Sequence, residues 1–235
     1  MNNRMIRGTA LFSLLYVVPA DAALTLTVEV KDHEKHRVQT HTWKLDGSRF
    51  RTESSNNRAK TIVIFDANTD KFFKISPAQK VYWELEGRQI QAIEMADKES
   101  NAPEPRRPSE DSRQFVPLNR ALTIAGYHCQ TYRVLEENKA VEEVCLSEWS
   151  NKRFQAEEFG TMDRLEKLLS ILAHGQRSPA VPPNISRGPG FPLVRVMLDS
   201  DGKPTHTATV KSIQRGSLPN ALFELPPGYT KQAIP

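Results

Sequence analysis

The sequence lacks the short motifs that mark the common classes of enzyme. It contains no G-x-S-x-G, no P-loop, no G-x-G-x-x-G and no H-E-x-x-H. Acidic pairs such as Glu142-Glu143 and Glu157-Glu158 are adjacent in the chain, so their carboxylates point apart on a strand or lie on a solvated helix side. Catalytic carboxylate pairs must instead converge in one cleft. The sequence therefore assigns no catalytic residue, and a hydrolase is the least favoured interpretation.

Long hydrophobic runs are absent beyond the N-terminal region. The run Ala10–Val18 is too short to span a bilayer, which requires about 20 apolar residues. Arg4 and Arg7 precede it, and the small–x–small pattern that signal peptidase needs ends at Ala22. We expect residues 1–22 to be a signal peptide that is cleaved after Ala22 and directs the chain to the periplasm. A buried N-terminal strand or helix is the alternative.

The remaining residues, 23–235, are expected to form one soluble domain. This length is sufficient for an adequate core without a metal ion or many disulfides. Residues 96–117 are charged, contain several prolines and have few apolar side chains, a composition typical of a loop or disordered insert. A second loop rich in proline and glycine is expected at 176–192.

Cysteine is scarce, with two residues in the whole chain, Cys129 and Cys145. Two strand patterns surround a turn at Glu137-Asn138, which is midway between the cysteines. A hairpin with this turn places the two side chains opposite each other, within reach of a disulfide. Because cysteines of exported proteins usually pair, we predict a Cys129–Cys145 disulfide. A redox or nucleophilic cysteine is the alternative, but no Cys-x-x-Cys is present.

The charge balance and the histidines give little sign of a partner or cofactor. The net charge of +4 is spread along the chain, which is weak support for any anionic partner, and we expect no nucleic acid. His33, His36 and nearby His41 lack a clear further metal ligand, so a solvated turn is the favoured interpretation. Residues 66–70 resemble the start of a calcium loop, but Lys71 stands where glycine is required. We therefore predict no metal site and no cofactor.

Strand patterns dominate the sequence that follows residue 23. Leu24, Leu26, Val28 and Val30 alternate with polar residues, as expected for a half-buried strand. Further strand patterns are short and closely spaced, which favours an antiparallel meander; they lie at 43–45, 60–66, 71–76, 80–86, on both sides of the cysteine hairpin turn, and around Asp201-Gly202.

Two segments have helical character. Residues 87–95 are compatible with a short helix, and residues 151–174 form a longer helical stretch in which Thr161 is a candidate N-cap and Gly175 a stop. The apolar residues of this second stretch fall on one helix face. We therefore predict a mainly β fold with helices: a strongly curved antiparallel sheet, an unclosed half-barrel, covered by one or two helices on its concave face.

Several short segments together form a recognisable pattern: Phe65-Asp66, Lys71–Ile75 with Pro77 and Tyr82, Ala125–Cys129 with Tyr132, Cys145 with Trp149, Gly190–Pro192 and Phe223–Tyr229. They resemble an uncharacterised periplasmic family, a domain of unknown function whose fold is similar to that of the lipoprotein carriers LolA and LolB. The resemblance spans most of the chain after residue 23, although no counterpart of the 96–117 insert is evident. It implies an unclosed barrel with a helical lid and a hydrophobic interior, and it supplies no catalytic residues.

The aromatic residues of the strands and the apolar residues of the second helix are the candidate lining of a ligand groove. An ordinary core is an equally good interpretation, because aromatic residues dominate any core, whereas apolar ligand sites are concave and lined in the same way. The predicted function is binding of an apolar or lipid ligand, or of a lipidated or envelope protein, by a protein that is soluble or peripheral to a membrane. The alternative is an envelope scaffold with a solid core that binds proteins through its sheet edge or loops. The predicted groove residues are Trp43, Phe65, Phe73, Trp83, Tyr127, Trp149, Met162, Leu165, Leu169 and Leu172.

Overall fold

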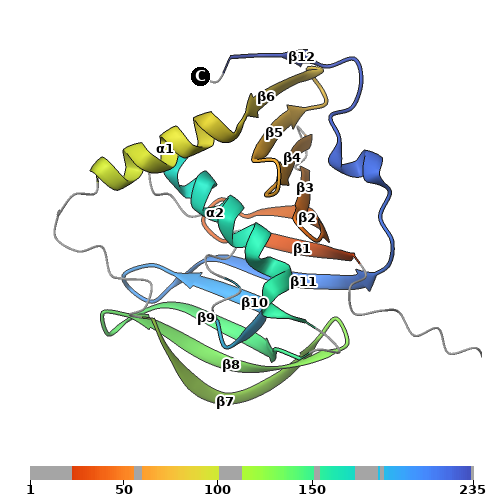
Figure 1. Ribbon diagram of the computed structural model, residues 1–235. Helices are drawn as coiled ribbons and strands as arrows, with labels where there is room; N and C mark the ends of the chain where they lie inside the picture. Colours follow the sequence, from red (N-terminus) through yellow and green to blue (C-terminus); the bar gives the residue numbers. More distant parts are fainter. Residues whose placement is uncertain are drawn as a thin grey trace, which may run out of the picture.

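The computed structural model describes residues 23–55, 60–100, 113–150, 154–172, 185 and 188–233. The predicted signal peptide and its cleavage point lie outside these ranges, as do Gly175 and most of the predicted loops. Within the described ranges, strands predominate (Figure 1).

The first half of the chain is an antiparallel meander. Each strand pairs with the next one along the chain, and the hairpin turn between β2 and β3 contains Gly47 with the positive φ of 58° that glycine adopts readily. The strands are β1 (Leu24–Asp32), β2 (Arg37–Asp46), β3 (Arg49–Ser55), β4 (Lys60–Asp66), β5 (Lys71–Ser76) and β6 (Val81–Leu85).

The second half is another antiparallel meander that joins the first edge to edge. Its last strand pairs with β1, and the short β12 (Thr230–Lys231) lies parallel to β6. A single 12-stranded sheet results, in the order β12-β6-β5-β4-β3-β2-β1-β11-β10-β9-β8-β7. The strands of this half are β7 (Gln114–Ile124), β8 (Tyr127–Glu136), β9 (Lys139–Glu148), β10 (Gly190–Leu198) and β11 (Pro204–Arg215).

The sheet is curved and its two ends do not pair, so the prediction of an unclosed half-barrel is confirmed. Helix α1 (Gly87–Ser100), the short 3-10 helix η2 (Ala156–Phe159) and helix α2 (Gly160–Leu172) lie against one face of it. Apolar side chains of that face and of the helices form the main core of the protein. Figure 1 shows α2 crossing the strands from β10 towards α1.

Some predicted boundaries are corrected by the structure. Helix α1 continues to Ser100 and β7 begins at Gln114, so both ends of the predicted 96–117 insert are regular structure; residues 101–112 lie outside the described ranges. Pro117 is tolerated in a strand because β7 is at the edge of the sheet. Thr161 is not an N-cap: η2 leads directly into α2, so Thr161 is already helical.

A second, smaller core covers the opposite face of the first meander. The chain leaves β11 and runs across that face as η4 (Asn220–Phe223) before it reaches β12 (Figure 1). Phe223 packs with Ile62, Ile64 and Ile75 of the sheet. The guanidinium group of Arg51 donates to the carbonyl oxygen of Leu222 over 2.8 Å. The C-terminal segment thereby covers strands β4 and β5 on the side away from the helices.

The predicted disulfide between Cys129 and Cys145 is present, with a Cα–Cα distance of 5.3 Å. The predicted register, in which the two cysteines lie directly opposite each other, is not observed. Glu136 pairs with Lys139 at the turn, one residue away from the register that would oppose the cysteines, and a bulge at Val134 shifts the pairing by one more, so that Cys145 lies opposite Thr131 and the cysteines are diagonal neighbours. Bulges of this kind increase the local bend of a strand, and the sequence midpoint of two cysteines does not reveal them.

Gly190 begins β10 at a close approach to β9. A Cβ atom there would fall 3.0 Å from the carbonyl carbon of Ser147 and nearer still to its oxygen, whereas a Cβ atom on Gly160 would meet nothing within 4 Å. The Gly190 position therefore excludes any side chain without movement of the backbone of β9.

We predict that Gly190→Ala destabilises the protein by about 1–3 kcal/mol, because the methyl group forces the two strands apart. Gly160→Ala is the matched control; Gly160 has helical φ and ψ, so alanine there should be neutral or stabilise by up to about 1 kcal/mol. Urea unfolding followed by circular dichroism measures both values. Equal midpoints for the two variants would contradict the close-approach argument.

Glu53 on β3 is the centre of a cluster of ion pairs. Its carboxylate contacts Lys60 at 2.6 Å, Arg51 at 2.8 Å and Lys44 at 3.1 Å. Burial raises the pKa of Glu53, but hydrogen bonds from Lys60, Arg51 and Lys44 outweigh burial and hold the pKa at about 2. The carboxylate therefore stays ionised over the whole range in which an unfolded glutamate becomes protonated.

This lowered pKa predicts a loss of stability in acid. The contribution of Glu53 is complete above the unfolded pKa of about 4.5 and is lost as the pH falls towards the folded value of about 2. Between pH 5 and pH 2 the free energy of unfolding of the native protein should fall by about 1–2 kcal/mol more than that of Glu53→Gln, after allowance for solvent screening. Unfolding free energies measured across this range test the difference. The exposed Glu34→Gln is the control and should follow the native curve.

Candidate functional site

The concave face of the sheet and the apolar face of α2 form the candidate site. Met162, Leu165 and Leu168 of α2 are completely or almost completely buried. They belong to the same core cluster as Trp43, on β2, and Phe65, on β4. Helical spacing places the three α2 residues on one side of the helix, which explains why this face is directed at the sheet.

A group of aromatic rings fills the part of the interior that adjoins β9 and β10. Phe191 stacks on Phe154, with ring centroids 4.3 Å apart, and on Phe159 at 4.8 Å. Tyr127 lies 5.2 Å from Phe154, and Trp149 lies 5.8 Å from Phe159. The predicted residues Tyr127 and Trp149 are thus in contact with the interior. The three phenylalanines were not predicted as site residues, although Phe191 is in a segment that carried the family resemblance.

The other predicted groove residues are distributed unevenly. Leu169 packs against the main core, whereas Leu172 is 37% exposed at the end of α2. Trp83 is half-buried near the sheet edge, and the ammonium group of Lys74 lies 5.6 Å from the centroid of its ring.

Phe73 is on the wrong face for a groove residue. It packs in the second core, 6.1 Å from the ring of Tyr82, on the side that η4 covers. Adjacent strand residues point to opposite faces, and Phe72 takes the interior position that the sequence analysis assigned to Phe73. Two neighbouring phenylalanines give no sequence signal for which one faces inward.

Polar contacts hold α2 in place at its edges. Arg164 donates to the carbonyl oxygen of Ala67 over 2.9 Å and contacts the carboxylate of Asp70 at 2.6 Å. The Thr161 hydroxyl donates to the carbonyl oxygen of Gly47 over 3.3 Å. These contacts tie the helix to the turns after β2 and β4. They lie at the rim of the core, where water can replace them.

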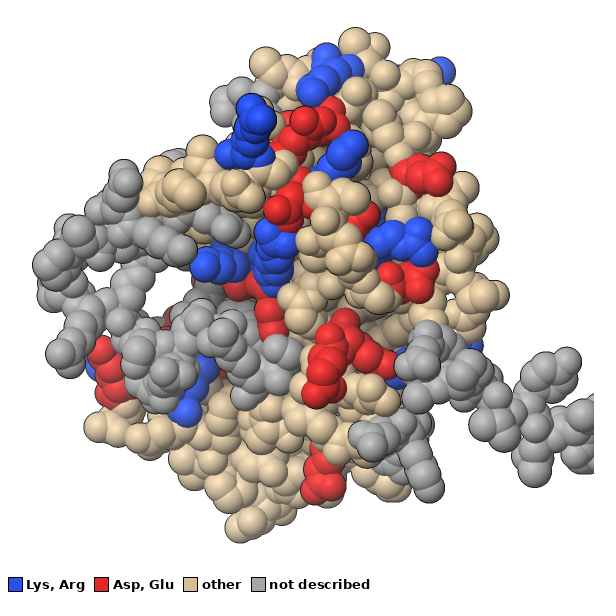
Figure 2. Space-filling model, in the orientation of Figure 1, with Lys and Arg blue, Asp and Glu red and all other residues tan. Residues whose placement is uncertain are grey.

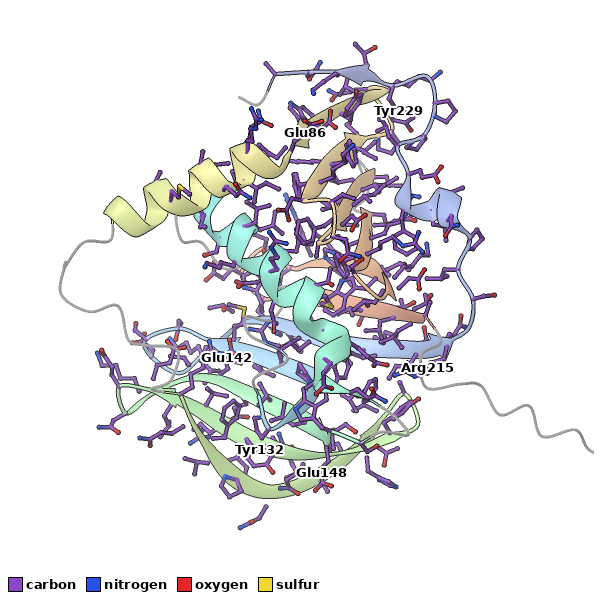
Figure 3. All side chains as sticks on the ribbon, viewed as in Figure 1. Glu86, Tyr132, Glu142, Glu148, Arg215 and Tyr229 are labelled. Atoms are coloured by element: carbon purple, nitrogen blue, oxygen red, sulfur yellow. A yellow bond between two sulfur atoms is a disulfide. The ribbon has the colours of Figure 1, made fainter. Side chains whose placement is uncertain are left out.

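A further ion pair holds the segment just before α2. Arg215, at the end of β11, donates to both carboxylate oxygens of Glu158 over 2.9 and 2.8 Å. Figure 3 shows Arg215 beside the N-terminal end of α2. A bidentate pair fixes orientation as well as distance, so the start of the helix is positioned by a strand that is remote in sequence.

Two charged residues lie inside the sheet near the same core. The guanidinium group of Arg195 on β10 donates to Glu142 on β9 over 2.6 Å, and the two side chains are 3% and 5% exposed. Arg113 approaches the same carboxylate at 3.9 Å and pairs with Glu136 at 2.8 Å. Figure 3 labels Glu142 beside β10. Buried charges require such pairing because an isolated charge in the interior costs several kcal/mol.

A small void, partly open rather than enclosed, is lined by Trp43, Arg195 and residues of the middle strands. Its volume is about 10 Å³, which is enough for about one water molecule. The indole Nε1 of Trp43 and the Nη1 of Arg195 are both buried and have no hydrogen-bond partner. The residues around the void are Val28, Trp43, Pro192, Leu193, Arg195, Ala208 and Val210.

The rest of the described surface offers less specific chemistry. In the ranges that the structure describes, no three or more His, Cys, Asp or Glu residues are arranged to hold a metal ion. His33 instead hydrogen-bonds Thr207 over 2.8 Å, and burial lowers the pKa of His41. On the face shown in Figure 2, positive and negative side chains are interspersed. None of the described helices has the length and apolar character needed to cross a membrane.

A family model for a domain of unknown function, DUF4412, matches residues 24–229. The chain belongs to the DUF4412 family. This match covers both meanders, α2 and the segment with η4, so the family comprises nearly the whole described fold. The expectation of an uncharacterised family, a domain of unknown function, is thereby confirmed. No curated protein matches this DUF4412 chain in sequence.

Solved structures resemble the DUF4412 chain in fold at low sequence identity. An uncharacterised conserved protein from Thermus thermophilus is 9% identical, with a TM-score of 0.51 over 90% of each chain. MucB, in the complex structure of Pseudomonas aeruginosa MucA/MucB, is 11% identical with a TM-score of 0.47, over 92% of this chain and 60% of that chain. A DUF1329 family protein from Desulfovibrio piger is 9% identical, with a TM-score of 0.31 over 89% of this chain and 91% of that chain. The likeness to the Thermus protein concerns the fold alone.

We predict that Arg164→Gln in the DUF4412 protein loosens α2 without unfolding the sheet. The variant loses the ion pair with Asp70 and weakens the contact with Ala67, which together contribute about 1 kcal/mol at a partly exposed site. Hydrogen exchange read by mass spectrometry should become several-fold faster within 160–172 and stay unchanged in β1 and β11. Arg133→Gln, which removes an exposed pair with Glu143, is the control. Equal exchange of α2 in both variants would show that Arg164 does not restrain the helix.

Proposed function

We propose that this DUF4412 protein is a non-catalytic binding protein of the periplasm. It holds an acyl chain, either of a lipid or of a lipidated protein, between the concave face of its sheet and α2. The proposal rests on how the apolar and polar contacts of α2 are distributed. Its inward face presents the large apolar side chains of Met162, Leu165 and Leu168, whereas its polar contacts to the turns lie at the rim.

The energy balance of such an exchange is favourable. Moving α2 aside uncovers three large apolar side chains, at a cost of about 1.5–3 kcal/mol each. A chain of about 16 carbons that takes their place buries CH₂ groups worth about 0.8 kcal/mol each, roughly 12 kcal/mol in total. The rim contacts add little to the cost, since water replaces hydrogen bonds of this kind at a net loss of about 1 kcal/mol apiece. The acyl chain therefore offsets the lost contacts of α2, and the surplus is set against the cost of moving the aromatic group around Phe191 and of association.

In this proposal, the described conformation is the closed state of a binding cycle. Rings and aliphatic side chains fill the described interior, and the void near Trp43 has a volume of only about 10 Å³. Binding therefore requires α2 to move, together with the aromatic group around Phe191. The Cys129–Cys145 disulfide supports an oxidising compartment, and it braces β8 against β9 while the helix moves.

We predict that the protein, purified from a bacterial periplasm, carries endogenous acyl compounds. Native mass spectrometry followed by lipid extraction should detect them, and a fluorescent fatty-acyl probe should bind the delipidated protein. Arg164→Gln should bind the probe several-fold more tightly, because less energy is needed to displace α2.

Arg133→Gln is the control and should bind the probe as the native protein does. Absence of endogenous acyl compounds, together with no probe binding by the native protein or by Arg164→Gln, would contradict the proposal. That result would favour a scaffold whose core stays closed and which binds proteins through its sheet edge.

A further inference from the structure

The void at the centre of the sheet has an unusual lining for an apolar core. Val28 of β1 and Ala208 and Val210 of β11 line its middle, since these two strands lie between β2 and β10 in the sheet. Trp43 of β2 and Arg195 of β10 line it from either side. Both of these side chains belong to residues that are 2% exposed, and each leaves one N–H donor group without a partner.

Unpartnered donors at such depth are costly. A buried N–H group that makes no hydrogen bond destabilises the folded protein by about 1–3 kcal/mol relative to one that does. Native proteins retain few unpartnered groups of this kind. The two residues that carry these donors line one void, so this place suits an acceptor atom. A carbonyl oxygen has two lone pairs, which matches two donors.

The electrostatics of the void select the type of acceptor. The charge of Arg195 is already compensated by Glu142, whose oxygen lies 2.6 Å from Nη2. A second carboxylate at Nη1 would bring a further negative charge into the core without a cation of its own, at the high cost of burying an isolated ion. A neutral oxygen avoids this cost and still satisfies both donors.

We propose that this void is the subsite for the carbonyl oxygen of an ester- or amide-linked acyl chain. The inference rests on the proposed function and specifies its ligand: acyl chains with a neutral linkage bind in preference to free fatty acids and to chains without a carbonyl group. Trp43, Leu193 and Val210 belong to the same core cluster as Met162 and Leu165. A chain whose carbonyl oxygen occupies the void therefore continues along the surface that α2 covers.

The test compares two ligands that differ only in the carbonyl group. Displacement of a fluorescent acyl probe from the native protein is measured with 1-palmitoyl-glycerol, an ester, and with 1-O-hexadecyl-glycerol, the matching ether. We expect the ester to bind about tenfold more tightly, the ratio that one to two net hydrogen bonds give. N-palmitoyl-ethanolamine provides the amide arm and shows whether a lipid ester or an N-acyl group fits better.

Variants connect the preference to the two donors. Trp43→Phe removes the indole donor and should reduce the ester-to-ether ratio to about threefold or less, the loss of about one net hydrogen bond. Tyr132→Phe removes a ring-borne donor in a separate cluster, beside Phe115, and should leave the ratio unchanged. Arg195→Lys keeps a cation beside Glu142 but offers fewer donors, so it should also lower the ratio. Thermal unfolding of each variant verifies that it is folded.

A spectroscopic readout avoids variants altogether. With ¹³C at the carbonyl carbon of the bound ester, the infrared carbonyl band should shift to lower frequency than in detergent, as expected for an oxygen that accepts two hydrogen bonds. Tight but equal binding of ester and ether, or a water molecule in the void of a ligand-bound crystal structure, would overturn the subsite and leave the proposed function intact. Binding of neither ligand would overturn both.

Discussion

The pairing of β1 with β11 is the contact on which the rest of the structure depends. It joins residues from the two ends of the described chain, with Leu24 opposite Arg215 and Asp32 opposite His206. Without it the two meanders would be separate sheets of ordinary size. With it they form one 12-stranded sheet, and a twisted sheet of this width curls. The curl creates the concave face, and the concave face gives α2 a place to bury its apolar side.

The same curl explains why the two sides of the sheet are covered differently. The concave side needs a narrow element that follows its axis, and helix α2 satisfies this need (Figure 1). The outer side of β4 and β5 is covered by the extended segment with η4, whose contacts combine Phe223 with the guanidinium groups of Arg49 and Arg51. This outer cover is tied to the sheet by main-chain pairing of β12. The helix, in contrast, makes no main-chain ladder with the sheet and is held by apolar side chains in the core and polar contacts at its rim.

The interior is therefore not uniformly apolar. Arg195 and Glu142 form a paired charge in the sheet, and the pair replaces apolar side chains that would cost less to bury. This buried pair lies next to unpartnered donors on Arg195 and Trp43. The core therefore contains one polar spot between β2 and β10 that is surrounded by apolar side chains. An amphiphile has the same asymmetry, and this correspondence is the physical basis of both the proposed function and the carbonyl subsite.

The sequence by itself determined the local features of this protein. Alternation of apolar residues identified the strand Leu24–Asp32, helical spacing identified the buried face of α2, and two cysteines beside one turn identified their disulfide, because all of these depend on neighbours within a few residues. The tertiary structure alone decided which of Phe72 and Phe73 faces inward, the diagonal register of the cysteines, and the meeting of Trp43 with Arg195. Each of these depends on sheet curvature, bulges and pairing between strands that are distant in sequence, and no local pattern encodes those properties.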